Sequence, residues 1–595
     1  MQTTKSITSQ SQLMSEQIRK LEHSILTYEE GFMPFLENLH QDYVQSGRNL
    51  IHYLALKNNN IDRLEDQLVN MGIAKLDTAL ANIIHSLSLT KKLLLNSHDH
   101  FGPPWDKPVV SIRMSKKLLA HHTRTLLGKK PTGRKSRIMV TLPVEAARDN
   151  KLVRNFIKKG MNIARINCAH DTPETWAAMI ANIQEANLSL NKNCKIAMDL
   201  GGPKLRTGPV KKGPEVVHIK PARDSLGKII EPALVWMAAP KSIPPVNAPV
   251  FVPASSGFIK SLRKGDKVEF KDTRGKNRHF EIIKKEGKGR WAYCYDSVYI
   301  TNGTKLKRVR QNQAKSIPDK VCELKPIEET IILNKGDTLI LTKNSAQGER
   351  AVYNSDGIII QNAHISTTMP EIFDYVKTGE PVLFDDGKIV GEITEVLKDE
   401  LHIRIHYVKS GGSKLKAEKG INLPDSDLKI KGLTEKDKKD LEFIAHHADM
   451  VNFSFVNNPE DVNDLLHELK KYNTEIGIIL KIETKQAVRK LPLILLTAMQ
   501  SCPVGVMIAR GDLAIECGWM EMANIQEDIL KICKAAHTPA IWATQVLENM
   551  AKKGLPSRAE ITDAAMSQRA DCVMLNKGAH ITAAIKMLDK ILKSI

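Results

Sequence analysis

The chain has 595 residues, several times the length that one hydrophobic core supports, so we expect two to four domains. Hydrophobic residues make up 42% and charged residues 26% of the sequence. These ordinary values exclude a largely disordered, collagen-like or coiled-coil chain. No segment approaches the ~18 uninterrupted apolar residues of a membrane-spanning helix, and residues 1–10 are polar, which predicts a cytoplasmic protein without a secretion signal.

Charge and cysteine distribution narrow the function classes further. The formal net charge is +20, and residues 209–320 alone hold 24 Lys and Arg against 10 Asp and Glu, so the basicity is local. The 8 cysteines are scattered singly, without close pairs or a nearby His cluster. This spacing predicts neither a zinc site nor a disulfide framework.

Residues 1–130 are predicted to form an all-helical region. Apolar residues recur there at steps of three and four, the period at which one face of a helix is buried. The clearest stripes are Ile18, Leu21 and Ile25, then Ile61, Leu64 and Leu68, then Leu80, Ile83 and Leu87. We see no chemistry in them and expect them to pack against one another or against the rest of the protein.

From Arg137 the pattern changes to short apolar, β-branched-rich runs separated by helical stretches, as in a parallel sheet with crossover helices. Eight such runs lie at 138–141, 163–167, 195–200, 450–454, 476–483, 504–509, 539–544 and 572–576. The segments 131–208 and 411–595 together hold 263 residues, near the ~250 of an eight-stranded barrel. The predicted fold is α/β, a (β/α)8 TIM barrel.

Residues 209–410 interrupt the barrel pattern with short alternating strands and frequent turn dipeptides. This texture predicts an enlarged, basic, β-rich domain inserted into a barrel loop. The turn Lys264-Gly265-Asp266 is echoed by Lys335-Gly336-Asp337, which suggests an internal duplication.

Polar and charged residues stand at the carboxyl ends of the apolar runs, where barrel enzymes place their active sites. They are Arg165, Asn167, Asp199, Ser454, Lys481, Glu483, Arg510, Asp512, Thr544 and Asn576. Such groups are costly at the exit of a buried strand unless they meet a ligand, a metal or one another. The alternative for any single residue is an ordinary solvated strand end.

Lys481 and Glu483 are two residues apart in a predicted strand, so their side chains point to the same face. With Asp512 at the next strand end, two carboxylates are available to hold Mg²⁺, which needs only one or two from a protein. Arg165 and Lys481 would then face the anion that the metal holds, an arrangement suited to phosphoryl transfer. The alternative is that Glu483 and Asp512 form structural ion pairs with Lys481 and Arg510.

Eight motifs resemble those of the pyruvate kinase family in order and spacing. The most specific are Lys481-Ile482-Glu483 and Ala509-Arg510-Gly511-Asp512. The full set lies at 161–167, 199–208, 384–387, 419–424, 481–483, 507–513, 543–545 and 558–560. The resemblance covers about residues 135–209 and 330–595, and it identifies the insertion as the lid domain of this family.

The resemblance implies a role for each matching residue. Glu483 and Asp512 would bind Mg²⁺ or Mn²⁺, and Lys481 would stabilise the phosphoryl group in transfer and the enolate left behind. Arg165 would contact the transferring phosphate, and the main chain of Gly511 and Asp512, with Thr544, would receive the substrate carboxylate. Arg206, His170 and Lys419 would bind the nucleotide, together with Asp386 on the lid.

Departures from the family pattern cluster on its potassium site. In potassium-dependent members, asparagine, serine and aspartate side chains and a threonine carbonyl coordinate K⁺. Asn167 and Asp199 remain here, but Ala169 stands where the serine would be, so the monovalent-cation site is degenerate. Lys204 replaces a glutamate and could supply the missing charge, which predicts turnover that does not require K⁺.

Two further departures concern the end of the chain. After the last run, Asn576-Lys577-Gly578 replaces the family's Ser-Gly-Glu. Asparagine cannot relay a proton as a hydroxyl does, so we expect reduced turnover or a different enol-phosphate substrate. The chain stops at Ile595, where family members continue into a regulatory domain. We therefore expect a divergent, bacterial-type member without that domain, its surface covered instead by the helices of residues 1–125.

Two functions follow as hypotheses. The first is a glycolytic phosphotransferase of pyruvate kinase type, which moves the phosphoryl group of phosphoenolpyruvate to ADP to give pyruvate and ATP, acting as a homo-oligomer. The second is a weakened or repurposed relative that serves as a binding or sensor protein. The basic run 305–310 is interpreted as a solvated face that attracts ADP and phosphoenolpyruvate. A nucleic-acid partner is not favoured, because aromatic residues are sparse around it.

Overall fold

The computed structural model describes residues 2–95, 110–245, 248–310 and 317–594. It divides into two compact units. The first unit comprises Met1–Leu205, Asp374–Gly387 and Gly420–Ile595, and it holds both the N-terminal helices and the barrel. The second unit comprises Arg206–Phe373 and Lys388–Lys419. The predicted insertion at 209–410 overlaps the second unit, but the short segment Asp374–Gly387 within it belongs to the first.

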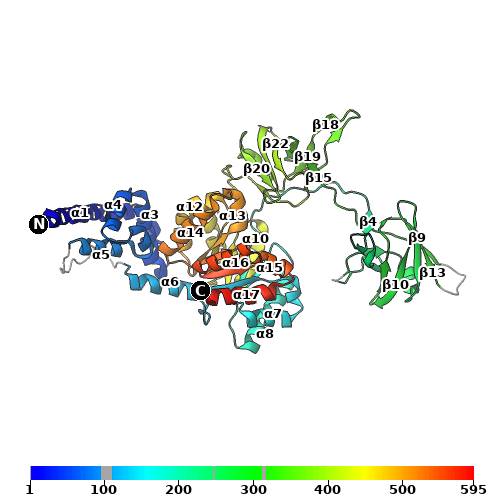
Figure 1. The fold of residues 1–595 in the computed structure, drawn as a ribbon, viewed down its shortest axis with the longest axis horizontal. Helices are drawn as coiled ribbons and strands as arrows, with labels where there is room; N and C mark the ends of the chain where they lie inside the picture. The colour runs from blue at the N-terminus through cyan, green and yellow to red at the C-terminus, as the bar shows by residue number, and fades with distance from the viewer. Residues whose placement is uncertain (1, 96–109, 246–247, 311–316, 595) are drawn as a thin grey trace. The chain divides into compact units, whose positions relative to one another are not determined.

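Eight parallel strands close into a barrel in the first unit (Figure 1), which confirms the predicted (β/α)8 fold. Their order around the barrel follows the chain, with the long interruption between β3 and β25. They are β1 (Arg137–Thr141), β2 (Ile163–Asn167), β3 (Lys195–Asp199), β25 (Met450–Phe453), β26 (Gly477–Ile482), β27 (Val504–Ala509), β28 (Ala540–Ala543) and β29 (Cys572–Leu575). Nearly all their residues are buried on both faces, which explains the continuous apolar runs in the sequence.

Helices alternate with these strands and cover the barrel. They include α7 (Asn150–Lys159), α8 (Pro173–Leu190), α10 (Glu435–His447), α11 (Pro459–Lys470), α12 (Lys485–Ala498), α14 (Met522–Ala535), α16 (Arg558–Met566) and α17 (Ile581–Ser594). Capping boxes begin two of the helices that come after site loops. Asn458 and Asp461 cap α11, which follows the loop after β25, and Ser557 and Glu560 cap α16, which follows the short helix α15 (Glu548–Lys553) after β28. These caps fix the ends of loops that carry site residues.

The N-terminal region is helical as predicted, and we call α1 to α6 the helical region. Its elements are α1 (Gln2–Glu30), α2 (Met33–Glu37), α3 (Val44–Asn58), α4 (Asp62–Asn70), α5 (Ile83–Leu95) and α6 (Ile112–Leu127), while residues 96–109 lie outside the described residues. The predicted stripe residues Ile18, Leu21 and Ile25 are buried. Across the described ranges, no helix combines the length and the apolarity that a bilayer crossing requires.

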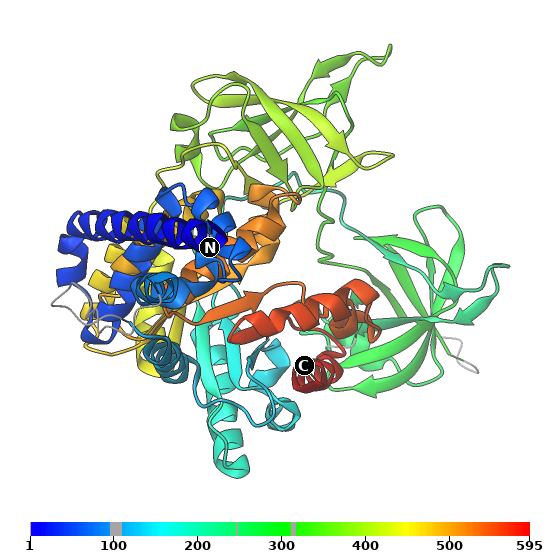
Figure 2. The same ribbon diagram turned by 60° about the vertical axis from the view of Figure 1, so that its left-hand side comes forward.

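The helical region, blue in Figures 1 and 2, packs on the barrel through α12 and α14. Asn49 on α3 joins the two parts, because its amide donates to the carbonyls of Leu80 and Ala535, each at 2.8 Å. Tyr43 also links the helical region to the barrel, because its hydroxyl accepts a hydrogen bond from the N–H of Val504 in a barrel strand, at 2.9 Å. The apolar stripes of this region are therefore buried partly against the barrel.

The amino end of the barrel is filled by the last residues of α6. Leu126 and Leu127 belong to one buried cluster with inward-facing residues of the strands, including Met139 and Ile479. Two strands carry glycine where they approach Leu126: a Cβ built on Gly505 would lie 2.4 Å from Leu126 Cδ2, and one on the glycine that begins β26 would lie 2.6 Å from Cδ1. A larger residue at either position would displace the Leu126 side chain. The helical region thus contributes to the barrel core.

The second unit contains two β-sheet modules with the same strand order. In the first, β7 (Ala233–Ala238) lies between a parallel partner, β8 (Phe251–Pro253), and an antiparallel one, β11 (Gly289–Cys294), which pairs in turn with β10 (Asn277–Glu286). In the second, β16 (Thr338–Thr342) has the parallel partner β19 (Ala363–Ser366) and the antiparallel partner β22 (Glu400–Val408), which pairs with β21 (Ile389–Val396). This shared order supports an internal duplication.

The repeated Lys-Gly-Asp turns that suggested the duplication are not equivalent positions. The Gly265 N–H donates to Ile282 in β10, at 2.8 Å, whereas the Gly336 N–H donates to Ile405 in β22, also at 2.8 Å. In the shared strand order β22 corresponds to β11 and not to β10. The shared strand order, and not the repeated turn, therefore supports the duplication.

Candidate active site

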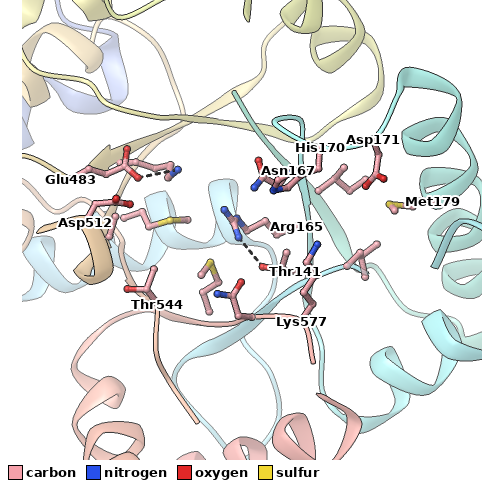
Figure 3. Close-up of a pocket in the computed structure, with 17 residues that line it drawn as sticks. Thr141, Arg165, Asn167, His170, Asp171, Met179, Glu483, Asp512, Thr544 and Lys577 are labelled. Atoms are coloured by element: carbon pink, nitrogen blue, oxygen red, sulfur yellow. Dashed lines mark hydrogen bonds and ion pairs between the residues drawn. The ribbon is translucent and has the colours of Figure 1, made fainter. Parts of the chain in front are cut away.

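Polar side chains from the carboxyl ends of the barrel strands surround a cavity of about 300 Å³, the site cavity (Figure 3). On one side lie Glu483, Asp512 and Thr544, and on the other lie Arg165, Asn167, His170, Asp171 and Lys577. Thr141, Lys481 and Asn576 also line it. Most of the residues predicted from the strand ends therefore meet around one space.

Asp199 is the centre of a buried charge network beside the site cavity. Its carboxylate receives two hydrogen bonds from Arg165, Nε to Oδ1 at 2.9 Å and Nη2 to Oδ2 at 2.7 Å, and one from the Asn452 amide at 2.7 Å. Lys481 Nζ lies 3.2 Å from Oδ2. Burial raises the pKa of Asp199, but the charges of Arg165 and Lys481 outweigh burial and hold this pKa at about 2. Asp199 is therefore ionised and fixes both cations.

The ammonium group of Lys481 lies between two carboxylates. Besides Asp199, it lies 3.1 Å from Glu483 Oε1 and donates to Ser454 Oγ at 2.7 Å. Burial alone would lower the pKa of Lys481, but the charges of Glu483 and Asp199 raise it, so this side chain stays charged. Because Lys481 and Arg165 both line the site cavity, two fixed positive charges face it.

Glu483 and Asp512 form a pair of carboxylates on one side of the site cavity. Glu483 follows β26, and its Oε2 accepts the Phe455 N–H at 2.7 Å. Asp512 lies in the first turn of α13 (Arg510–Cys517). Burial raises the pKa of Glu483, Lys481 opposes the rise, and the like charge of Asp512 adds to it. A cation between the two carboxylates would relieve this repulsion.

The ion-pair alternative for these carboxylates holds only in part. Lys481 does contact Glu483, but Arg510 pairs with Asp563, Nη1 to Oδ1 at 2.5 Å and Nη2 to Oδ2 at 2.9 Å, and not with Asp512. Asp512 Oδ1 is instead 2.8 Å from Lys204 Nζ. Among the described residues, Asp512 Oδ2 has no hydrogen-bond partner, so this carboxylate keeps an oxygen for a ligand.

Thr544 has a backbone conformation that β-branched residues rarely adopt. It directly follows β28 with φ at 65°, and Gln545 continues at 57°. Its hydroxyl donates to the Ala543 carbonyl at 2.7 Å and accepts the Gly511 N–H at 2.7 Å. Strained residues of this kind concentrate at functional sites. The predicted carboxylate donors, the Gly511 main chain and Thr544, therefore lie side by side.

The residues predicted for the nucleotide are distributed over both units. His170 lines the site cavity, and Asp386 belongs to the first unit, in a turn with φ at 58°. Arg206 and Lys419 belong to the second unit. There Arg206 Nη1 donates to the Glu418 carbonyl at 2.9 Å, and the Lys419 N–H donates to Thr207 Oγ1 at 2.9 Å. Of the four residues, His170 is the one that lines the site cavity.

The oxygens of the degenerate potassium site have partners within the protein. Asn167 Oδ1 accepts the Ala169 N–H at 3.1 Å. Leu200 stands where the family has the threonine, and its carbonyl accepts the Ser454 hydroxyl at 2.7 Å. Both oxygens of Asp199 bind Arg165. The Lys204 ammonium forms an ion pair with Asp512 and lies 5.6 Å from the ring centroid of Phe455.

Three residues of this region were missed by the sequence reasoning. Asn452 holds Asp199, and its position two residues before Ser454 on one strand face was the available signal. Lys577 lines the site cavity directly after the predicted Asn576. Glu516 lies one turn beyond Asp512, where burial raises its pKa to about 7 although the Asn422 amide donates to it at 2.7 Å. No sequence pattern marked Glu516.

The basic part of the chain forms a face of the first β-module in the second unit. A cavity of about 530 Å³ there is lined by Lys271, Arg278, His279, Lys305 and Lys307, with Glu269, Phe270 and Asn277. Lys305 stands directly opposite Lys320 on the neighbouring strand. Like charges in this position destabilise a sheet, and a bound anion would offset the effect.

Comparison with known proteins identifies the family. Residues 133–230 and 319–583 match the model of the pyruvate kinase barrel domain. The pyruvate kinase of Thermotoga maritima is 36% identical over 243 residues, which cover 40% of this chain and 50% of that protein. The pyruvate kinase of Bacillus licheniformis is 34% identical over 235 residues, 39% of either chain, and that of Thermococcus litoralis is 31% identical over 273 residues, 45% of this chain and 53% of its own.

The chain spans about half the length, or less, of these relatives. The family match leaves out residues 231–318, which hold most of the first β-module. The matched residues nevertheless make up more than half of the chain and include the barrel with every residue that lines the site cavity. The chain belongs to the pyruvate kinase family.

Proposed function

We propose that the protein transfers the phosphoryl group of phosphoenolpyruvate to ADP, giving pyruvate and ATP. The observation that carries this proposal is the placement of Lys481: a buried, charged ammonium between Asp199 and Glu483, on a cavity that Arg165 and Asp512 also line. Phosphoryl transfer relies on positioning and on neutralising spread negative charge, and these groups could provide both. Family membership supports the same reaction.

The transfer breaks the bond between phosphorus and the enol oxygen while a terminal oxygen of ADP bonds to the same phosphorus. The electron pair of the broken bond stays on the enol oxygen, and the resulting enolate takes a proton at carbon to become pyruvate. Arg165 and Lys481 face the charge that shifts between these oxygens. To hold the substrate carboxylate, the Thr544 hydroxyl would turn from the Ala543 carbonyl and the Gly511 N–H from Thr544. This contact would orient the enol oxygen towards Lys481.

Glu483 and Asp512 suit a divalent ion such as Mg²⁺ or Mn²⁺. Both offer hard carboxylate oxygens, and their mutual repulsion in a buried setting is the condition that a divalent cation relieves. When bound there, the ion would draw negative charge from the phosphoryl oxygens and steady the substrate. The residues of the chain therefore fit the family's metal requirement.

We further propose that turnover does not require K⁺. The oxygens that would bind K⁺ already have partners in the protein, and Lys204 supplies a fixed positive charge beside Asp512. A fixed ammonium replaces an exchangeable ion in this role. Replacing K⁺ by a large inert cation in the assay should leave the rate unchanged, and strong activation by K⁺ would contradict this part of the proposal.

The carboxyl end of β29 favours a second candidate, a weakened or repurposed member of the family. Asn576 and Lys577 line the site cavity in place of the family's serine and glycine. At Gly578, where the family has glutamate, an added Cβ would lie 2.4 Å from the Ala551 carbonyl, so no side chain fits. Proton delivery to the enolate is the step these changes would slow.

Steady-state assays separate the two candidates. The purified protein should form pyruvate from phosphoenolpyruvate and ADP in the presence of Mg²⁺, and a chelator should stop the reaction. A repurposed binding protein would instead bind phosphoenolpyruvate, measured by calorimetry, without forming pyruvate. Light scattering on the same sample tests the homo-oligomer that we expect from the family.

The basic face of the first β-module is proposed to attract anionic substrates to the protein. Nucleic acid is the competing ligand, and filter binding at low and moderate salt distinguishes the two. Direct phosphate contacts would give an affinity that falls steeply with salt, whereas we expect no retention of nucleic acid at moderate salt.

A further inference from the structure

Three distant segments of the first unit bring metal-ligating side chains together where the helical region meets the barrel. His40 and Asp42 lie between α2 and α3, His121 lies on α6, and Cys502 lies between α12 and β27. One ligand atom each from His40, Asp42 and Cys502 lie within 4.8 Å of one another. No residue of this cluster lines the site cavity, so the chemistry proposed above does not use it.

Asp42 is the centre of the cluster. Its Oδ2 lies 3.7 Å from Cys502 Sγ and 3.5 Å from His121 Nε2. His40 Nδ1 accepts a hydrogen bond from the Asp42 N–H at 3.2 Å, a long contact that coordination through this nitrogen would replace. One carboxylate oxygen is thus approached by a thiol and an imidazole, with a second imidazole alongside.

The backbone holds these side chains in place without a metal. The His40 N–H donates to the Met499 carbonyl at 2.8 Å, at the end of α12. His122 Nε2 lies 3.2 Å from the Asp42 carbonyl oxygen, and the hydroxyl of the adjacent Tyr43 accepts the Val504 N–H. The segment with two of the ligands is therefore fixed against the loop that carries Cys502.

We propose that His40, Asp42, His121 and Cys502 form a Zn²⁺ site that links the helical region to the barrel. Two imidazole nitrogens, one carboxylate oxygen and one thiolate sulfur make a ligand set that Zn²⁺ accepts, in the four-coordinate form of structural sites. On binding, the Cys502 thiol releases its proton to solvent and the sulfur bonds to the ion. A sulfur ligand disfavours Mg²⁺ and Ca²⁺, so this site differs in kind from the Glu483 and Asp512 pair.

The site's expected effect is on the stability of the contact between helices and barrel. Asp42 and His121 are about half exposed, at 45% and 57%, so an ion can enter and leave without unfolding of the chain. A ligand that binds only the folded state stabilises it by mass action. We therefore expect Zn²⁺ to raise the unfolding temperature of the metal-free protein.

Cobalt provides the direct test, because Co²⁺ bound to a thiolate gives a charge-transfer absorption band that oxygen ligands do not give. The full-length protein, stripped with a chelator, should develop this band with one equivalent of Co²⁺ and lose it when Zn²⁺ is added. Cys502→Ser should abolish the band, whereas Cys517→Ser, at a half-buried thiol outside the cluster, should keep it. Asp42→Asn and His40→Ala should each weaken Co²⁺ binding at least about tenfold.

Absence of the band, or a band that survives in Cys502→Ser, would overturn the zinc site. Circular dichroism of the metal-free variants confirms that they fold. A Zn²⁺-induced rise in unfolding temperature should occur in the unchanged protein and in Cys517→Ser but not in Cys502→Ser. Co²⁺ bound by Glu483 and Asp512 would give no thiolate band, so the result does not depend on the proposed phosphotransferase activity.

Discussion

Apolar side chains fill the amino end of the barrel, whereas charged side chains surround its carboxyl end. At the amino end Leu126 reaches between strands that carry glycine to admit it. At the carboxyl end Arg165, Lys481, Asp199 and Glu483 are all buried and all charged or held in ion pairs. The same closed sheet therefore supports two ends with opposite chemistry.

The difference teaches which end contributes stability and which contributes function. Burying apolar side chains stabilises a fold by about 25 cal/mol per Å² of surface removed from water. Burying charges costs free energy even when they are paired, and apolar replacements often do as well or better. A costly network beside a cavity is what we expect where the charged residues serve chemistry, as proposed for this end. Substitutions at the two ends should separate activity from stability, and the predictions below test that separation.

Glu483→Gln, at the carboxyl end of the barrel, should give the largest effect, a loss of activity. The amide can still accept the Phe455 N–H, but it carries no charge for a divalent ion or for Lys481. We expect kcat to fall on the order of 10³-fold in a protein that still folds, because Lys481 keeps its contact with Asp199. Glu548→Gln, at an exposed ion pair with Lys552, is the matched control. Activity within tenfold of the unchanged protein would contradict the proposed role.

Leu126→Ala, at the amino end, should lower the stability of the protein and leave its activity nearly unchanged. Removing a side chain that is 2% exposed leaves a cavity between β26 and β27, and we expect a loss of about 3 kcal/mol in the free energy of unfolding by urea. The kcat of the folded protein should stay within about twofold. Leu188→Ala, at a side chain that is 85% exposed, should change stability by less than about 0.5 kcal/mol. Equal losses in the two variants would show that α6 is not part of the barrel core.

His537 should make stability depend on pH where the helical region meets the barrel. Its ring nitrogens contact Ser46 Oγ at 3.1 Å and the Ala81 carbonyl at 2.8 Å, and burial lowers the pKa of His537 to about 4. Below pH ~6.5 the unfolded chain binds a proton at His537, whereas the folded chain does so only near pH 4. The stability that the neutral ring contributes is therefore complete above pH ~6.5 and is lost as the pH falls towards 4. We expect about 2 kcal/mol less stability at pH 5 than at pH 7 from this residue.

His537→Gln should remove this part of the pH dependence, because glutamine keeps a donor for the Ala81 carbonyl but does not titrate. Urea unfolding at pH 7 and pH 5 measures the difference. His446→Gln, at an exposed ring, serves as the control. An unchanged pH dependence in His537→Gln would show that this ring is not kept neutral by burial.

Lys204→Glu should have the smallest effect, on cation dependence. The change removes the ammonium beside Asp512 and adds a negative charge there. We expect the rate without K⁺ to fall about tenfold and K⁺ to restore part of it, as measured by titration with KCl against a large inert cation. Lys438→Glu, at an exposed pair with Glu435, should leave the cation response unchanged. A Lys204→Glu variant whose rate does not respond to K⁺ would exclude our proposal that the Lys204 ammonium replaces the charge of K⁺.

The barrel could be predicted because each strand is a short apolar run that ends in polar residues. All eight runs, from 138–141 to 572–576, became barrel strands. The local spacing of Lys481 and Glu483 also predicted their contact, since alternate residues of a strand share a face. Features determined by a single segment were thus accessible from the sequence.

Contacts between distant segments were not accessible in this way. Leu126 lies more than 350 residues from the glycines on which it packs, and Lys204 reaches Asp512 instead of its neighbours in sequence. The cysteine spacing gave no sign of the zinc site that we propose, because the residues clustered around Asp42 come from distant segments at residues 40, 42, 121 and 502. Side-chain meetings of this kind depend on how the elements pack, which composition and periodicity do not determine.

The comparison of Lys481→Met with Lys485→Met tests the central claim most directly. Both variants remove one ammonium, but Lys481 lies between Asp199 and Glu483, whereas Lys485 pairs with Asp425 at 2.6 Å on the protein surface. With phosphoenolpyruvate, ADP and Mg²⁺, the account predicts pyruvate formation by the unchanged protein and by Lys485→Met, and none above background by Lys481→Met. Equal rates in the two variants, or no pyruvate from the unchanged protein, would contradict it.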